Sequence, residues 1–282
     1  MREVRDSVRR SIESRAGGLW WPGLAQTLAR ERQSRLSFHS AQYSTSRFLG
    51  ADGPEWVSAL DSNPAPDRLA LRLEVIEASV ARRFAGRGID LIGGAEITAA
   101  MGEAIAAATS LICLVPSLAT TVGALVRSVH VLQSTDPGID ISFSDPAIPF
   151  SIFLSVSKCV EADLRIAEAI IHESMHLQLS LVEELVPLVR DDRITIYSPW
   201  KQANRPLSGV MHALYVFRVI DEWLASISPS DCGSQFIGRR RGQIADEIKE
   251  LDLAGCESGF TGEGRKLLSG LLRATDTSSQ FR

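Results

Sequence analysis

The feature that most constrains the fold is an apolar helix that carries two histidines. Residues 163–186 place apolar side chains at helical spacing, and Pro187 ends the run. Within it, residues 172–176 read His-Glu-Ser-Met-His, which is an HExxH pattern. Histidines at positions i and i+4 lie one turn apart on one helix face, so both imidazoles can reach a single ion. We therefore predict that His172 and His176 bind a metal.

The competing interpretation is that both histidines are structural. In that case, two imidazoles and the Glu173 carboxylate would be buried in an apolar helix without a ligand to compensate them. Burying polar and charged groups without such partners costs free energy. A catalytic metal also needs a third donor and an open position. We favour His212, because a loop over residues 187–205 lets the next long helix return antiparallel and bring it to the same place. The alternatives are acidic: Glu183, Asp221 and Glu222. We interpret the remaining histidines, His39 and His130, as structural or surface residues.

The second long helix is predicted to begin with Asn204 as its cap and Pro206 in its first turn, and to end near Ser226. Arg205 precedes His212 by two helical turns and would share its face. A guanidinium at a helix amino terminus could hold a carboxylate beside the metal. In the alternative, Arg205 is an exposed residue paired with a loop carboxylate, Asp191 or Asp192.

Two aromatic residues in the preceding loop, Tyr197 and Trp200, are candidates for the wall of the same pocket. The alternative is that they only anchor the loop.

The rest of the chain predicts a mostly helical α+β fold. Its expected helices span 1–15, 22–36, 67–85, a run from about Glu96 into the uncharged stretch 104–126, and a terminal pair at 238–251 and 263–274; the predicted strands span 128–133, 139–143 and 148–156. A Gly-, Pro- and Asp-rich break covers 50–66. We expect a helical region over 1–127 and a metal-binding region over 128–282, which together form one continuous globular unit. The histidine helix is expected to pack under the small sheet in a zincin-like arrangement.

Composition argues against export and membrane insertion. Four separated cysteines form no CxxC pair, and no apolar run of signal-peptide length precedes Leu19, so we expect a cytoplasmic protein with reduced thiols. The uncharged stretch 104–126 is alanine-rich and contains Pro116, which favours two buried helical pieces over a membrane span.

Residues 1–50 hold nine arginines and four acidic residues. This could attract an acidic peptide or nucleic acid, although a solvated helix face is the commoner explanation, and we expect no nucleic-acid partner.

A resemblance extends these expectations. Residues 148–223 resemble the HExxH-motif peptide-modification proteins of bacterial gene clusters that make ribosomal, post-translationally modified peptides. The matching features are the Pro149-Phe150-Ser151-Ile152 strand with Ser155, the helix from Ile170 to Leu177, the loop from Tyr197 to Trp200, Arg205-Pro206, Gly209, His212 and Val216-Phe217. Some members are iron- and 2-oxoglutarate-dependent hydroxylases (dioxygenases) that act on side chains of a precursor peptide. The resemblance implies that His172, His176 and His212 hold Fe(II), and that Arg205 anchors 2-oxoglutarate.

Two other functions stay open at this point. In a zinc metallopeptidase, Glu173 would act as the general base toward a metal-bound water. The residues after His176 complete neither the metzincin nor the thermolysin pattern, which favours the hydroxylase. A three-histidine iron site would depart from the common set of two histidines and one carboxylate. The third possibility is a non-catalytic metal- or peptide-binding module.

Overall fold

The computed structural model describes residues 2–14, 18–39, 69, 71–75, 78–86, 89–133, 141–145, 148–156, 159, 161–227 and 233–273. The break expected over 50–66 lies outside these residues, as does Cys232. The chain forms two compact units: the central unit, residues 25–177, and the terminal unit, which combines residues 1–24 with 178–282. Most described residues are helical and the sheets are small, which confirms a mostly helical α+β fold. The predicted division into 1–127 and 128–282 stays a prediction.

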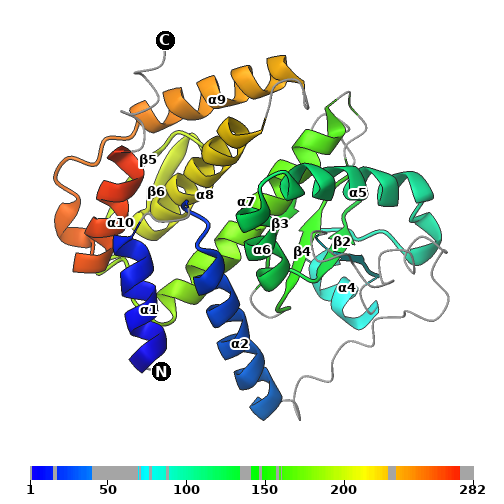
Figure 1. Cartoon of the computed structure of the whole chain (residues 1–282), viewed down its shortest axis with the longest axis horizontal. Coiled ribbons are helices and arrows are strands. Elements are labelled where there is room, and N and C mark those ends of the chain that lie inside the picture. Colours follow the sequence, from blue (N-terminus) through cyan, green and yellow to red (C-terminus); the bar gives the residue numbers. More distant parts are fainter. Residues whose placement is uncertain are drawn as a thin grey trace. The chain divides into compact units, whose positions relative to one another are not determined.

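A four-stranded sheet forms the core of the central unit (Figure 1). Its order is β1-β2-β4-β3, where β1 is Arg72–Leu73, β2 is Ser128–Val131, β3 is Ser142–Phe143 and β4 is Ser151–Leu154. The first three strands in this order run parallel, and β3 pairs with β4 in the antiparallel sense. Every residue of β2 and β4 is buried, as expected of β-branched and aromatic strands covered on both faces. The three strands expected after residue 127 are therefore confirmed, although they are shorter than predicted.

The prediction of a single helix over residues 67–85 is wrong for the first half of this range. Residues 72–73 form β1, and only α4 (Ala78–Ala85) is helical. Leu71 and Leu73 are buried while Arg72 between them is exposed. This alternation has the period of a strand, and it was misread because leucines at 69 and 73 also fit helical spacing.

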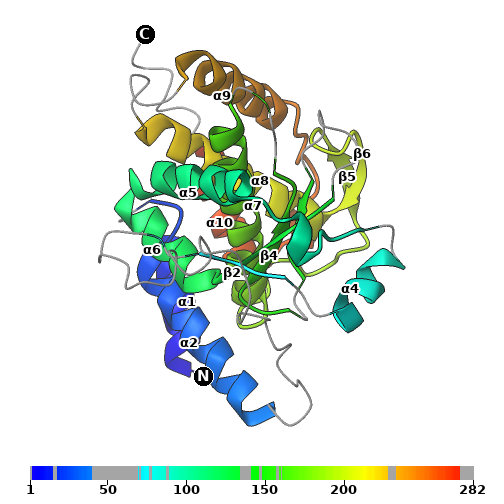
Figure 2. The same ribbon diagram turned by 90° about the vertical axis from the view of Figure 1, so that its right-hand side faces the viewer.

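Helices α5 and α6 confirm the interpretation of the uncharged stretch. A 3-10 turn, Gly94–Glu96, precedes α5 (Ala99–Cys113), and α6 (Pro116–Leu125) begins with its proline in the first turn, where no backbone N–H is needed. The two helices pack against each other (Figure 2). None of the described helices is long and apolar enough to cross a membrane. The expected helix over 22–36 is present as α2, Pro22–His39.

Helix α7, Ala162–Glu183, contains the HExxH pattern and matches the strongest helix expected from the sequence. It begins in the central unit and its last turns belong to the terminal unit. Ile170, Ile171 and Met175 are fully buried around the pattern. The apolar spacing of the sequence therefore determines which face of α7 is left for polar side chains.

The terminal unit contains the remaining elements: α1 (Arg2–Glu13), β5 (Thr195–Ser198), β6 (Ala203–Pro206), α8 (Leu207–Ser226), α9 (Ser234–Lys249), a 3-10 turn (Glu257–Gly259) and α10 (Gly262–Arg273). Helix α8 packs against α9, α10 and the β5–β6 hairpin (Figure 2). Helix α1 packs against α10, with salt bridges from Arg9 to Glu263 and from Lys266 to Glu13. The expected helix over 1–15 and the terminal helical pair are thus confirmed.

Candidate metal centre

His172 and His176 point their outer ring nitrogens at each other. Their Nε2 atoms are 3.1 Å apart, and the ring planes meet at 68°. Two imidazoles bound to one ion at about 2.0–2.1 Å, with this separation between their nitrogens, subtend an angle of about 95–102° at the ion. That value lies between octahedral and tetrahedral geometry. The pair therefore fits two neighbouring ligands of one divalent metal ion.

Glu173 lies between the two histidines in sequence, but the sheet holds its side chain. It is 3% exposed, and its Oε1 accepts a hydrogen bond of 2.7 Å from the Ser142 hydroxyl on β3. The same oxygen is 4.0 Å from Nε2 of His172. The carboxylate is thus close to one candidate ligand and fixed by another element. Sequence reasoning did not identify Ser142, because the position of a strand against a helix face cannot be read from either segment alone.

His212 and Glu183, the two leading candidates for the third ligand, are direct neighbours in the terminal unit. Nε2 of His212 and Oε2 of Glu183 are 2.9 Å apart, and the two side chains are 15% and 25% exposed. Helix α8 supplies the histidine and the end of α7 supplies the carboxylate. A carboxylate that accepts the N–H of an imidazole fixes its tautomer and ring orientation, a common arrangement around metal-binding histidines.

The other acidic candidates take part in structural contacts. Asp221 accepts a hydrogen bond from Arg218, within α8, at 3.0 Å, and one from Arg241 of α9 at 2.8 Å, which links the two helices. Glu222 accepts a hydrogen bond from the backbone N–H of Leu19 at 3.4 Å. Both carboxylates are thus used in holding the terminal unit together.

The predicted placement of Arg205 on the helix of His212 is wrong. Residues 203–206 form strand β6, in which Arg205 pairs with Ile196 of β5, and α8 begins only at Leu207. Asn204 is therefore a strand residue and not a helix cap. Arg205 is exposed, and its side chain lies alongside the first turn of α8, where a Cβ added to Gly209 would be 3.7 Å from its Nε. The hairpin was missed because its strands are largely exposed and lack apolar alternation.

The amino terminus of α8 already has an anion, supplied by the chain itself. Asp192 accepts a hydrogen bond from the Ser208 backbone N–H and another from its hydroxyl, both at 2.9 Å. Asp191 pairs with Arg193, which lowers the pKa of the carboxyl to about 2. The two loop carboxylates considered as partners of Arg205 therefore have other partners: Asp192 binds Ser208, and Asp191 binds Arg193. Asp192 already places a negative charge at this end of α8, where the sequence suggested that a ligand carboxylate could bind.

Of the two loop aromatics, Trp200 anchors the loop to α8, whereas Tyr197 faces solvent. The Trp200 ring stacks on Phe217 of α8 with centroids 5.3 Å apart, and the Arg240 guanidinium lies 5.2 Å from the Phe217 ring. Tyr197, on β5, is 48% exposed. Trp200 therefore attaches the hairpin to α8, which is the alternative weighed from the sequence.

His130 is a core residue of the sheet, as expected. It is fully buried on β2, stacks on Phe153, and its Nδ1 is 2.9 Å from the Glu74 carbonyl oxygen. Burial lowers the pKa of His130 to about 4, while the hydrogen bond to Glu74 acts in the opposite direction. His39 is the last residue of α2, and its side chain lies outside the described part of the chain.

Within the ranges that the structure describes, no group of three or more His, Cys, Asp and Glu side chains is gathered closely enough to hold a metal. The structural observations therefore consist of one histidine pair on α7 and one carboxylate–imidazole pair between the end of α7 and α8. No family model matches the chain, and no match is found among curated proteins.

Proposed function

We propose that this chain is a metal-dependent peptide-modifying enzyme, an Fe(II)- and 2-oxoglutarate-dependent hydroxylase of a side chain in a ribosomally made precursor peptide. The observation that carries the proposal is the 3.1 Å separation of the His172 and His176 nitrogens, which suits two ligands of one ion. The order of motifs from residue 148 to residue 223, which resembles the HExxH peptide-modification proteins, gives the reaction class.

In this proposal, His172 and His176 bind the ion from α7 and His212 is the third ligand predicted from the sequence. Glu183 accepts the hydrogen bond of the His212 ring N–H and so fixes the tautomer and orientation of the imidazole. When bound, Fe(II) would activate dioxygen, the oxidant of the hydroxylation, while 2-oxoglutarate would be oxidatively decarboxylated to succinate and carbon dioxide. We expect His212→Ala to lower metal content more than Glu183→Ala, because the first removes a ligand and the second only its orientation. The opposite ranking by elemental analysis would make Glu183 the ligand.

Glu173 is proposed as a positioning residue. Its Oε1 accepts the Ser142 hydroxyl and lies near His172, so it can hold that imidazole while β3 holds the carboxylate. A general base in a peptidase must instead reach a metal-bound water. Attachment of Glu173 to Ser142 therefore favours the hydroxylase over the zinc metallopeptidase. The same contact, which ties the edge strand β3 to α7, supports a zincin-like arrangement of helix and sheet.

Arg205 remains the proposed partner of the 2-oxoglutarate carboxylate, although it does not lie on the helix of His212 as the sequence predicted. Arg205 is exposed on β6, and Asp192, one of its two alternative partners, accepts two hydrogen bonds from Ser208. An arginine fork suits a carboxylate well. The proposal for Arg205 therefore rests on this chemistry and on the resemblance.

The test is anaerobic reconstitution of the metal-free protein with Fe(II) or Zn(II), followed by exposure to dioxygen in the presence of 2-oxoglutarate and measurement of succinate. The proposal predicts succinate with iron alone, and its loss in His172→Ala and His176→Ala. A matched control is His130→Phe, which changes a histidine that is buried in the sheet. Peptide cleavage with zinc, and no succinate with iron, would assign the chain to the metallopeptidases. Metal binding without either reaction would leave a non-catalytic binding module.

A further inference from the structure

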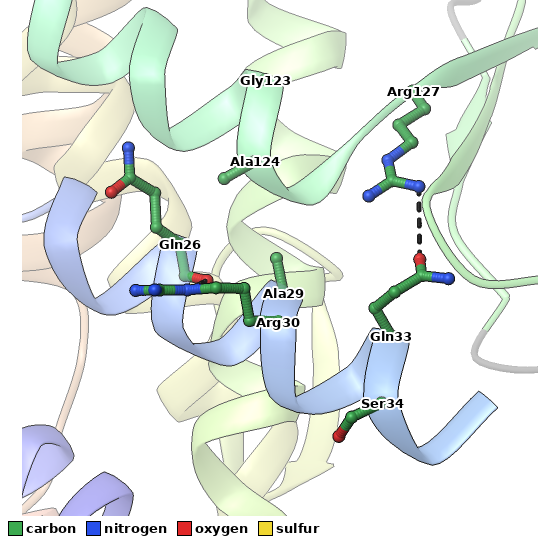
Figure 3. Close-up of a pocket in the computed structure, with 8 residues that line it drawn as sticks. All are labelled: Gln26, Ala29, Arg30, Gln33, Ser34, Gly123, Ala124 and Arg127. Carbon is green, nitrogen blue, oxygen red and sulfur yellow. Dashed lines mark hydrogen bonds between the residues drawn. The ribbon is translucent and has the colours of Figure 1, made fainter. Parts of the chain in front are cut away.

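A pocket with both polar and apolar lining lies in the central unit, between the exposed face of α2 and the end of α6. Its volume is about 620 Å³, a size that takes a small ligand or a short peptide segment. Its wall is formed by Gln26, Ala29, Arg30, Gln33, Ser34, Gly123, Ala124 and Arg127. The α2 residues recur at intervals of three and four, so they form one helix face (Figure 3). None of the described lining residues carries a carboxylate, while two carry a positive charge.

The two cations lie at opposite ends of this pocket. Figure 3 shows Arg30 beside Gln26 at one end and Arg127 beside Gln33 at the other, with Ala29 and Ala124 between them. The Arg127 Nη1 donates to the Gln33 side-chain oxygen at 3.2 Å, and its guanidinium lies 4.5 Å from the centre of the Phe150 ring. The Arg30 Nε donates to the Gln26 carbonyl oxygen at 3.2 Å. Both guanidinium groups are therefore held in place before any ligand arrives.

This arrangement favours a ligand with two separated carboxylates. Gln26 and Gln33 are two helical turns apart, about 10 Å along α2, which is about the length of three extended residues. Their amides and the Ser34 hydroxyl can both donate and accept, as a peptide backbone requires. Two alanines, Ala29 and Ala124, and Gly123, which has no side chain, leave space for a main chain between the two charges.

We propose that this pocket between α2 and α6 binds an acidic segment of an extended peptide, with Arg30 and Arg127 each pairing with one carboxylate. The inference rests on the proposed function in one respect: the bound segment belongs to the peptide that the enzyme modifies. It assigns that recognition to a pocket that contains none of the candidate metal ligands.

The experiment measures fluorescence anisotropy of a labelled peptide in which two aspartates are separated by two glycines, titrated with metal-free full-length protein. Arg30→Gln and Arg127→Gln should each raise Kd about 1.5- to fivefold, the range expected for one exposed ion pair. Arg82→Gln, on α4 outside the pocket, removes the same charge and should leave Kd unchanged. Binding should weaken with added salt.

A second test compares a negative with a positive substitution at Ala124, and it does not depend on removing a native contact. Ala124→Glu should raise Kd more than Ala124→Lys, because the two side chains fill similar space and differ in the sign of the charge that they place between the arginines. Equal binding of an asparagine version of the peptide, or equal Kd values for the two Ala124 variants, would overturn the inference. Displacement by inorganic phosphate as readily as by unlabelled peptide would overturn it in favour of a small-anion site. Because no metal or turnover is involved, failure here is separable from failure of the succinate assay.

Discussion

Acidification should unfold this protein partly through His130, and the size of that effect follows from its burial. The imidazole is fully buried on β2, and burial lowers its pKa from 6.5 to about 4. The unfolded chain therefore binds a proton more readily than the folded one between these pH values, and folding stability falls as pH falls through this window. From pH 7.5 to pH 5.5, the loss due to this residue is about 1.4 kcal/mol, and it reaches about 2.5 kcal/mol at pH 4.5.

The assay is urea unfolding followed by circular dichroism at pH 7.5 and 5.5, on the natural chain and on His130→Phe. The phenylalanine keeps a ring beside Phe153 and removes the titration, while the lost hydrogen bond to Glu74 costs the same at both pH values. The natural chain should lose about 1.4 kcal/mol more than the variant. Equal losses in the two proteins would refute the assignment of His130 as a neutral core residue.

Three further predictions concern the site and its supports. Ser142→Ala should destabilise the fold by about 1–3 kcal/mol in urea unfolding, because the buried Glu173 loses a donor; an unchanged midpoint would contradict this. Asp192→Ala should cost about 1 kcal/mol, since Ser208 loses the cap of α8, and a neutral result would show that water replaces it fully. Arg205→Ala should weaken the response to 2-oxoglutarate far more than iron content; unchanged cosubstrate dependence would remove Arg205 from the site.

The sequence predicted the elements whose pattern is local. The apolar spacing of α7 and the position of Pro116 at the start of α6 could be read directly, as could the buried strands β2 and β4. The pairing of His172 with His176 followed from helix geometry alone. In each case, neighbours in sequence determine the structure.

The errors arose where distant segments decide the structure. The exposed β5–β6 hairpin is stabilised by strand pairing and by the stacking of Trp200 on Phe217, neither of which leaves an apolar period in the sequence. Arg205 was placed on a helix because Pro206 suits a first turn as well as a strand end. The contact of Asp192 with Ser208 spans a whole hairpin and could not be anticipated from spacing.

The most direct test of the account is the metal content of the purified chain after reconstitution with Fe(II) under anaerobic conditions. We predict about one ion per chain, and near-complete loss in His172→Ala and in His176→Ala, because each variant removes one of the three proposed ligands and leaves too few to hold the ion. Full metal content in either variant would contradict the claim that the two histidines bind one ion.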